Sequence, residues 1–415
     1  MGFVDPLIAI IITIGLLIVL LYKRVNLGIA LNATALFLAL LAVDLAEIIP
    51  TVIKTTSDLL TISVCAATFG IMLLSELYRE TGMIKRLSES ISRLIDNPKI
   101  VLCILPAIIG LLPVGGGALM SAPLVDSEAD RLKMKQSKKA YVNLWFRHTI
   151  FPVYPLAPVM IATAVLTGVS IPSIILRQIP VVLVMVVVGY VIGFRNVPPP
   201  EKSLRDTPTG KRTDLRGFLF SFFPILITIV IDVLLNLAGF NTLLSGFDVV
   251  VAILIGIAIF VMMTRLNLTV FIKPFKSWGI WGITAAAYGA FLLRNMMDAA
   301  GISSVFSSYV ANGNVDILLF LAEGPALLGL LTGSAQGGVA VAVSILSTIL
   351  PLPFAAKVAA LVYTSAYLGY TIAPTHLCLT FTANYFKCSL GKMYKYVLPS
   401  FLLTFPVALV VYLLL

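Results

Sequence analysis

Two polar clusters interrupt apolar stretches of the sequence and hold its most versatile side chains. They comprise Asn143, Arg147, His148, Tyr154 and Pro155 in one cluster, and Thr371, Thr375 and His376 in the other. A guanidinium binds carboxylates, and an imidazole titrates near neutral pH. These residue types are suited to binding a small anion and to relaying protons, although packed neutral histidines are an equal alternative. We predict that the two clusters line one substrate site.

The composition identifies the environment of these residues. The chain has 415 residues, of which 59% are hydrophobic and 12% charged, and its net charge is +10. Soluble domains carry about 25% charged residues, so a soluble enzyme, a disordered protein and a nucleic-acid-binding domain are excluded. The four cysteines show no metal or disulfide spacing and are interpreted as buried free thiols. We predict a polytopic membrane protein.

Arg147 is the most informative of these residues. An unpaired guanidinium within a membrane costs at least about 2.5 kcal/mol, so it often marks a pathway or a bound anion. Two other interpretations remain open. Arg147 could pair with Asp126, Glu128 or Asp130, or its side chain could extend to the cytoplasmic surface.

Glycine runs interrupt two further apolar stretches, about 99–125 and 315–350. The runs are 113–117 (PVGGG) and 332–338 (TGSAQGG). The pieces on either side are too short for an easy crossing, which favours re-entrant hairpins. The tip residues predicted to bind substrate are Gly115, Gly116, Gly117, Ser334, Gln336 and Gly337. A sodium ion could bind main-chain groups of Val114, Gly116, Gly333, Ser334 and Ala373; no other cofactor is expected.

Ten apolar ranges are long enough to cross a bilayer. They are 4–22, 27–46, 58–78, 139–166, 172–194, 216–238, 246–264, 277–297, 355–385 and 393–414. With both termini outside, the clusters of Lys and Arg all fall in the cytoplasm, as the positive-inside rule requires. Prolines and glycines within 139–166 and 355–385 predict two broken helices, and 83–95 is suited to an interfacial helix.

The sequence also contains signs of an internal duplication. Residues 66–74 align with 285–293, and glycines and prolines before the two glycine runs keep the same offset. Apolar segments resemble one another by chance, but glycine and proline matches in register favour a true repeat. Five spans in each half would give opposite orientations. We therefore predict an all-α fold of two inverted repeats, 1–197 and 216–415, joined by a cytoplasmic linker at 198–215.

This pattern resembles the ion transporter superfamily, which includes divalent anion/sodium symporters, gluconate permeases and the large membrane subunits of TRAP transporters. The stretch 112–123 (LPVGGGALMSAP) is similar to an uncharacterised prokaryotic integral membrane family of that superfamily. The resemblance implies elevator-type movement of a transport domain, usually in a homodimer. Divalent anion symporters carry Ser-Asn-Thr at both hairpin tips, and this chain does not.

The functional prediction is a secondary active transporter of the cell membrane. It would move a small carboxylate-like anion coupled to sodium or protons. The alternative is a cation/proton antiporter without an organic substrate, in which the histidines and Glu76 would matter more. Motifs such as HExxH, GxSxG and the Walker loop are absent from the sequence, so we do not expect an enzyme. Solvated positions or local ion pairs are the favoured roles of Glu76, Glu80, Arg294 and Asp298.

Overall fold

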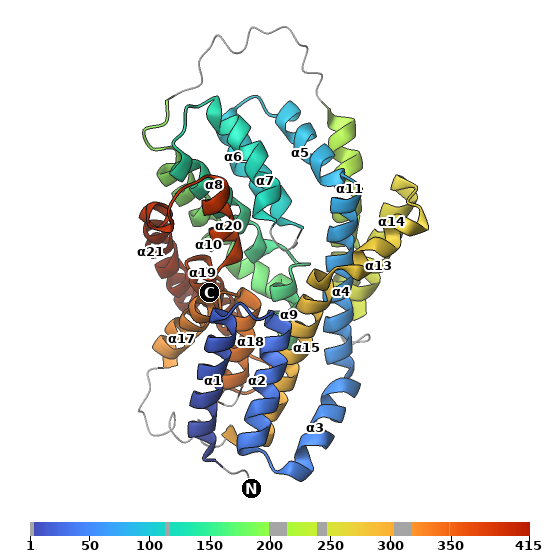
Figure 1. Ribbon diagram of the computed structural model, residues 1–415, viewed down its shortest axis with the longest axis vertical. Helices are drawn as coiled ribbons and strands as arrows, with labels where there is room; N and C mark the ends of the chain where they lie inside the picture. Colours follow the sequence, from blue (N-terminus) through green and yellow to red (C-terminus); the bar gives the residue numbers. More distant parts are fainter. Residues whose placement is uncertain (1–3, 113–116, 199–213, 239–246, 303–316, 348) are drawn as a thin grey trace.

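The computed structural model describes residues 4–112, 117–198, 214–238, 247–302, 317–347 and 349–415. Within these ranges the chain forms helices and turns and contains no strand. The all-helical prediction is therefore confirmed for the described residues. Figure 1 shows the helices arranged along one long axis.

The helices before the linker follow one another with short connections. They are α1 (Pro6–Tyr22), α2 (Leu27–Ala42), α3 (Leu45–Ser57), α4 (Leu59–Glu80), α5 (Met83–Leu94), α6 (Pro98–Gly110), α7 (Ala118–Asp130), α8 (Gln136–Thr149), α9 (Pro158–Thr167) and α10 (Ile171–Phe194). A short 3-10 turn, Phe151–Val153, lies between α8 and α9.

The described helices after the linker form a similar succession. They are α11 (Leu215–Leu237), α13 (Phe247–Thr264), α14 (Leu268–Ile272), α15 (Trp278–Ala299), α17 (Ile317–Thr332), α18 (Ala335–Leu346), α19 (Ala356–Thr371), α20 (Leu377–Tyr385) and α21 (Leu390–Leu414). The linker itself lies almost wholly outside the described residues.

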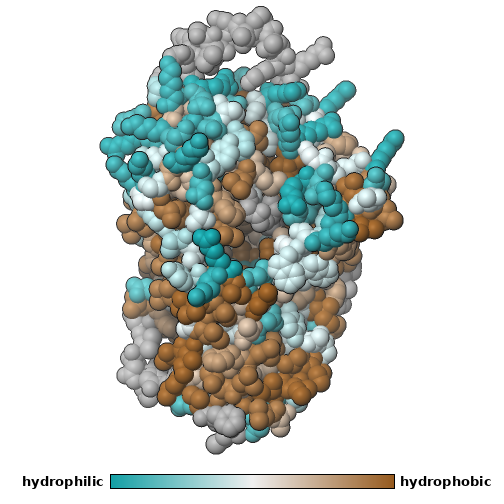
Figure 2. All heavy atoms as spheres, in the orientation of Figure 1, coloured by the Kyte–Doolittle hydropathy of each residue, from teal (hydrophilic) through white to brown (hydrophobic). Residues whose placement is uncertain are grey.

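Six of the helical segments are long and apolar enough to cross a membrane. They are Leu59–Glu80, Gln136–Thr167, Ile171–Phe194, Leu215–Leu235, Phe247–Thr264 and Leu390–Leu414. Shorter apolar helices include α2, α6, α17 and α18. Figure 2 shows hydrophilic residues gathered at the end of the molecule that holds α5, α6 and α7, and hydrophobic residues over the other half. These features are those of a membrane protein.

One helix was not expected from the sequence. Most of its residues lie between two of the predicted spans, 27–46 and 58–78, yet 45–57 form α3. Its polar residues and an internal proline at Pro50 obscure the apolar periodicity, while Asp44 caps the helix by accepting a hydrogen bond from the Ala46 N–H at 3.2 Å. The helix expected over 83–95, in contrast, is present as α5, with Met83, Leu87 and Ile91 buried on one face.

Packing between the halves is reciprocal. The helix α9 packs on α18, and α20 packs on α7. In the same way α10 packs on α19, and α8 packs on α21. Figure 1 shows α6 and α7 in the upper part of the molecule and α17 and α18 in the lower part. Each of these helix pairs therefore contacts the broken segment of the other half.

The crossing of α17 with α19 brings two helix backbones together. Gly329 lies against the Ala366 carbonyl, and Gly369 lies against the Ala326 carbonyl, so the two backbones touch. A Cβ at either glycine would collide with main-chain atoms. This crossing holds α17, the first helix of the second hairpin, against α19, the helix that leads into the second break.

Candidate functional site

The break between α8 and α9 follows from two prolines. An α-helix would pair the His148 carbonyl with the N–H of residue 152 and the Phe151 carbonyl with that of residue 155, but both positions are proline and have no N–H. Tyrosine hydroxyls from α19 replace the missing donors. Tyr367 donates to the His148 carbonyl at 2.6 Å, and Tyr363 donates to the Phe151 carbonyl at 3.0 Å.

The second break is held by the last helix. Tyr394 on α21 donates a hydrogen bond to the Ile372 carbonyl at 2.9 Å, just after α19 ends at Thr371. The Ala373 carbonyl accepts the His376 N–H at 3.0 Å. The Ala373 carbonyl, which the sequence offered as a sodium ligand, therefore has a protein donor. A carbonyl has a second lone pair, so Ala373 keeps the capacity to bind a cation.

Arg147 lies between the first hairpin and the second break. Its side chain is buried, with 2% of the residue exposed. One terminal nitrogen, Nη2, donates to the Leu112 carbonyl at 3.2 Å, whereas Nε and Nη1 have no hydrogen-bond partner in the described part of the chain. The charge is close enough to both His148 and His376 to act on them. A buried cation with two free donors is suited to binding an anion.

The alternative interpretations of Arg147 are wrong. Its candidate acidic partners bind other cations: Asp126 and Asp130 both pair with Lys139, and Glu128 pairs with Arg131 at 2.9 Å. Its burial also excludes extension of the side chain to the surface. The described residues therefore provide no carboxylate that would neutralise this guanidinium.

The two histidines meet although they are far apart in the sequence. Their ring centroids are 4.8 Å apart in an edge-to-face arrangement. Nδ1 of His148 lies 2.7 Å from the Leu144 carbonyl, which leaves Nε2 free. His376 precedes α20, is 1% exposed, and makes no ring hydrogen bond of good geometry to a described residue. Tyr370 covers it, with ring centroids 3.9 Å apart.

A thiol completes this group. One nitrogen of each histidine and Sγ of Cys378 lie within 4.8 Å of one another. Two imidazoles and a thiolate are ligands for a soft metal such as zinc or monovalent copper. The neighbouring charge of Arg147 opposes a second cation here, so metal binding would also require an anion. The four cysteines are free, as expected, and half-buried rather than buried.

Asn143 connects the first hairpin to α20. Its Nδ2 donates to the Ala118 carbonyl at 3.0 Å and to Thr382 Oγ1 at 3.3 Å, while Oδ1 has no described partner. Gly117 is buried and precedes α7. The other predicted tip residues, Val114, Gly115 and Gly116, lie outside the described residues.

The second hairpin tip packs on the second break. Gly333 has a φ of +60°, and a Cβ there would collide with Oγ1 of Thr375. Ser334 caps α18 by accepting the Gly337 N–H at 3.1 Å, and its carbonyl accepts the Thr332 hydroxyl at 3.0 Å. Two polar atoms at this junction, Nε2 of Gln336 and Oγ1 of Thr375, are buried without a described hydrogen-bond partner.

Three of the predicted site residues differ from the others in their contacts or in their role. Thr371 donates its hydroxyl back to the Leu368 carbonyl at 2.6 Å. Tyr154 is buried and lies within electrostatic range of Asp232, on the side of α11 rather than beside the histidines. Pro155 is buried in the break itself, where its role is to remove a donor. Sequence reasoning missed Tyr363, Tyr367, Tyr370 and Cys378, because aromatic residues on an apolar helix resemble ordinary core.

Two buried carboxylates were also missed. Asp232 on α11 and Asp248 on α13 are each 2% exposed, and their charges act on each other. Oδ1 of Asp232 makes no hydrogen bond to a described residue. The sequence did contain a signal for them, because each is an ionisable residue inside an apolar range. Ionisable groups in spanning helices are usually functional.

The remaining charged residues make local contacts. Glu76 pairs with Arg79, and Glu80 pairs with Lys273 on the connection before α15. Arg294 donates to the Leu166 carbonyl at 3.4 Å and lies near Asp298. The structure thus agrees with the local roles expected for Glu76 and Glu80.

A family model described as "Protein of unknown function (DUF401)" matches residues 6–415. The chain therefore belongs to this family. A comparison with curated proteins finds no match.

Proposed function

We propose that this member of the DUF401 family is a secondary active transporter that moves a small carboxylate-like anion with a sodium or proton gradient. The observation that carries the proposal is Arg147, a buried cation without a described acidic partner. A planar guanidinium with two free donor nitrogens matches the two oxygens of a carboxylate. The bound anion would neutralise the charge that the protein leaves uncompensated.

The arrangement of the helices supports an inverted repeat. Each half contains a helix pair followed by a broken segment, and each pair packs on the broken segment of the other half. Secondary transporters commonly place substrate where such breaks meet near the middle of the membrane. This supports a place in the ion transporter superfamily, with elevator-type movement, a homodimer and both termini outside as parts of the same proposal.

The coupling ion would bind close to the anion. A sodium ion could use the carbonyls of Ser334 and Ala373 at the junction of the second tip with the second break. Protons could instead use His148 and His376, whose rings are in contact. Either ion would favour anion binding by adding positive charge beside it.

The test is uptake of a panel of radiolabelled carboxylates into proteoliposomes, with sodium and proton gradients imposed separately. We expect one gradient to drive accumulation and Arg147→Gln to reduce it by about thirtyfold or more, as expected when a buried charge partner is lost. Arg177→Gln is the matched control because that side chain donates to main-chain oxygens of Ser173, near the beginning of α10, and of Leu415. Accumulation that needs neither gradient, or that survives in Arg147→Gln, contradicts the proposal.

A second candidate is a cation/proton antiporter, and the observation that favours it is the buried pair Asp232 and Asp248. Two neighbouring buried carboxylates can exchange a proton for a cation. Glu76 is less suited to that role than expected from the sequence because Arg79 neutralises it. Sodium-evoked pH changes in dye-loaded proteoliposomes without an organic anion, lost in Asp232→Asn, would support this function over the first.

A further inference from the structure

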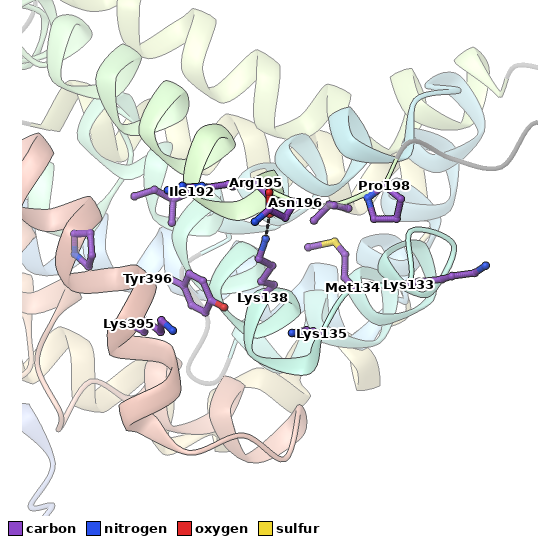
Figure 3. Close-up of a pocket in the computed structure, with 12 residues that line it drawn as sticks. Lys133, Met134, Lys135, Lys138, Ile192, Arg195, Asn196, Pro198, Lys395 and Tyr396 are labelled. Atoms are coloured by element: carbon purple, nitrogen blue, oxygen red, sulfur yellow. Dashed lines mark hydrogen bonds between the residues drawn. The ribbon is translucent and has the colours of Figure 1, made fainter.

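A cavity of about 450 Å³ opens between the end of α10 and the beginnings of α8 and α21, away from the buried histidines. Figure 3 shows the side chains of Lys138 and Tyr396 directed into the space between α10 and α21. Lys138 is held there because its Nζ donates to the Arg195 carbonyl at the end of α10. The volume is in the range of small-molecule sites.

The cavity is strongly basic. Lys135, Lys138, Arg195 and Lys395 contribute to its lining, and no acidic residue does so in the described part of the chain. Lys135, Arg195 and Lys395 form no ion pair with a described carboxylate. Other basic residues on this side of the protein do have acidic partners, as Lys273 has Glu80. The cavity is therefore a site of uncompensated positive charge with room for an anionic group.

The helices that form the cavity continue away from it as apolar, exposed surfaces. On α10, Val191 is 58% and Val187 61% exposed. On α21, Leu398 is 41% and Leu402 65% exposed. Both helices meet the length and hydropathy of membrane spans, so these faces are suited to contact with acyl chains. A ligand with an anionic head and apolar tails would match both parts of the surface.

We propose that this cavity binds the head group of an anionic phospholipid from the cytoplasmic leaflet. The phosphate would lie among Lys135, Lys138 and Lys395, and the acyl chains would lie along the apolar faces of α10 and α21. Basic pockets between membrane helices are suited to such head groups. Lipid in this position would join α8, on which Arg147 lies, to α10 and α21. The choice of leaflet rests on the proposed orientation with both termini outside, whereas lipid binding itself does not depend on transport activity.

The test measures lipid binding to the full chain purified in detergent, by native mass spectrometry. Dioleoyl phosphatidylglycerol is the probe, dioleoyl phosphatidylcholine is the zwitterionic control, and glycerol 1-phosphate is the soluble competitor. We expect phosphatidylglycerol to bind in preference to phosphatidylcholine. The double variant Lys135→Gln/Lys395→Gln should raise its Kd by roughly thirtyfold.

Two further variants separate the cavity from general surface charge. Lys85→Gln/Lys276→Gln removes the same charge from exposed positions outside the cavity and should change the Kd by less than about threefold. Ile192→Trp fills the cavity without changing the charge and should also weaken binding. Melting temperature and size-exclusion profile establish that each variant is folded.

Some outcomes would overturn the proposal. Equal weakening by the two lysine double variants would mean that the lipid responds only to net charge. Undiminished binding in Ile192→Trp would place the lipid elsewhere. If glycerol 1-phosphate displaces the lipid at equal concentration, the acyl chains contribute nothing and the ligand is a free phosphate compound.

Discussion

The hydroxyl of Tyr367 on α19 donates a hydrogen bond to the main-chain carbonyl of His148 on α8, at 2.6 Å. Pro152 leaves that carbonyl without its helical donor, and the tyrosine supplies one from the other half of the chain. The break beside Arg147 is therefore stabilised by the helix that leads into the second break. The two halves of the candidate site are coupled through this bond.

Removal of this hydroxyl should destabilise the protein. Tyr367→Phe leaves the buried His148 carbonyl unsatisfied, which costs about 1–3 kcal/mol. We expect a lower melting temperature in detergent, while Tyr190→Phe, at a position 43% exposed on α10, should have little effect. Equal melting temperatures for both variants would mean that water satisfies the carbonyl.

The α17–α19 crossing predicts opposite effects of one substitution at two positions of the same helix. Gly329→Ala introduces a methyl group against the Ala366 carbonyl and should cost about 1–3 kcal/mol through overpacking. Gly324→Ala meets nothing closer than Phe320 at 3.8 Å and should stabilise α17 by about 0.5–1 kcal/mol. Thermal unfolding of the purified variants measures both changes. Stabilisation by both substitutions would show that the helices can separate at no cost.

The second hairpin tip offers a similar comparison for transport. Gly333 has a positive φ and touches Thr375, so Gly333→Ala should displace the tip from the break and abolish uptake. The closest atom to a methyl group at Gly337 is the end of the Leu27 side chain at 3.2 Å, and its other contacts are ordinary, so Gly337→Ala should retain a large part of the activity. Uptake per folded molecule in proteoliposomes distinguishes the two variants. The opposite order of activities would place the ligand at Gly337.

The pH dependence of stability should contain a contribution from Asp214. Hydrogen bonds from the Gly217 N–H at 2.9 Å and the Ser90 hydroxyl at 3.1 Å lower its pKa from the ordinary value of 3.8. Since the folded-state pKa is the lower one, the stabilisation is complete above pH 3.8 and is lost as the pH falls below it. Asp214→Asn should therefore melt earlier than wild type at neutral pH.

The decisive measurement is the melting temperature of Asp214→Asn and of wild type at acidic pH. Asparagine can still cap α11, so the variant isolates the contribution of the charge. The difference in melting temperature between the two proteins should shrink below about pH 4. A difference that stays constant down to pH 3 would assign the effect to the hydrogen-bond geometry instead.

The sequence by itself determined the helical class, the membrane character and the two polar clusters. Long apolar ranges and a low charge content leave few other solutions, because a bilayer requires continuous main-chain hydrogen bonding. Pro152 and Pro155 also predicted the break between α8 and α9, since a proline removes a donor wherever it stands. The apolar pattern did not predict α3, because its polar residues and Pro50 interrupt the periodicity.

Only the tertiary structure decided how these residues meet. His148 and His376 are in contact because α19 crosses beside α8. Nothing in the sequence indicates that the two rings lie close together. The partners of Asp126, Glu128 and Asp130 are likewise set by packing, because several nearby cations compete for them. That competition leaves Arg147 unpaired among the described residues. The role of a buried charge depends on the partners that the fold places beside it and on those that it keeps away from it.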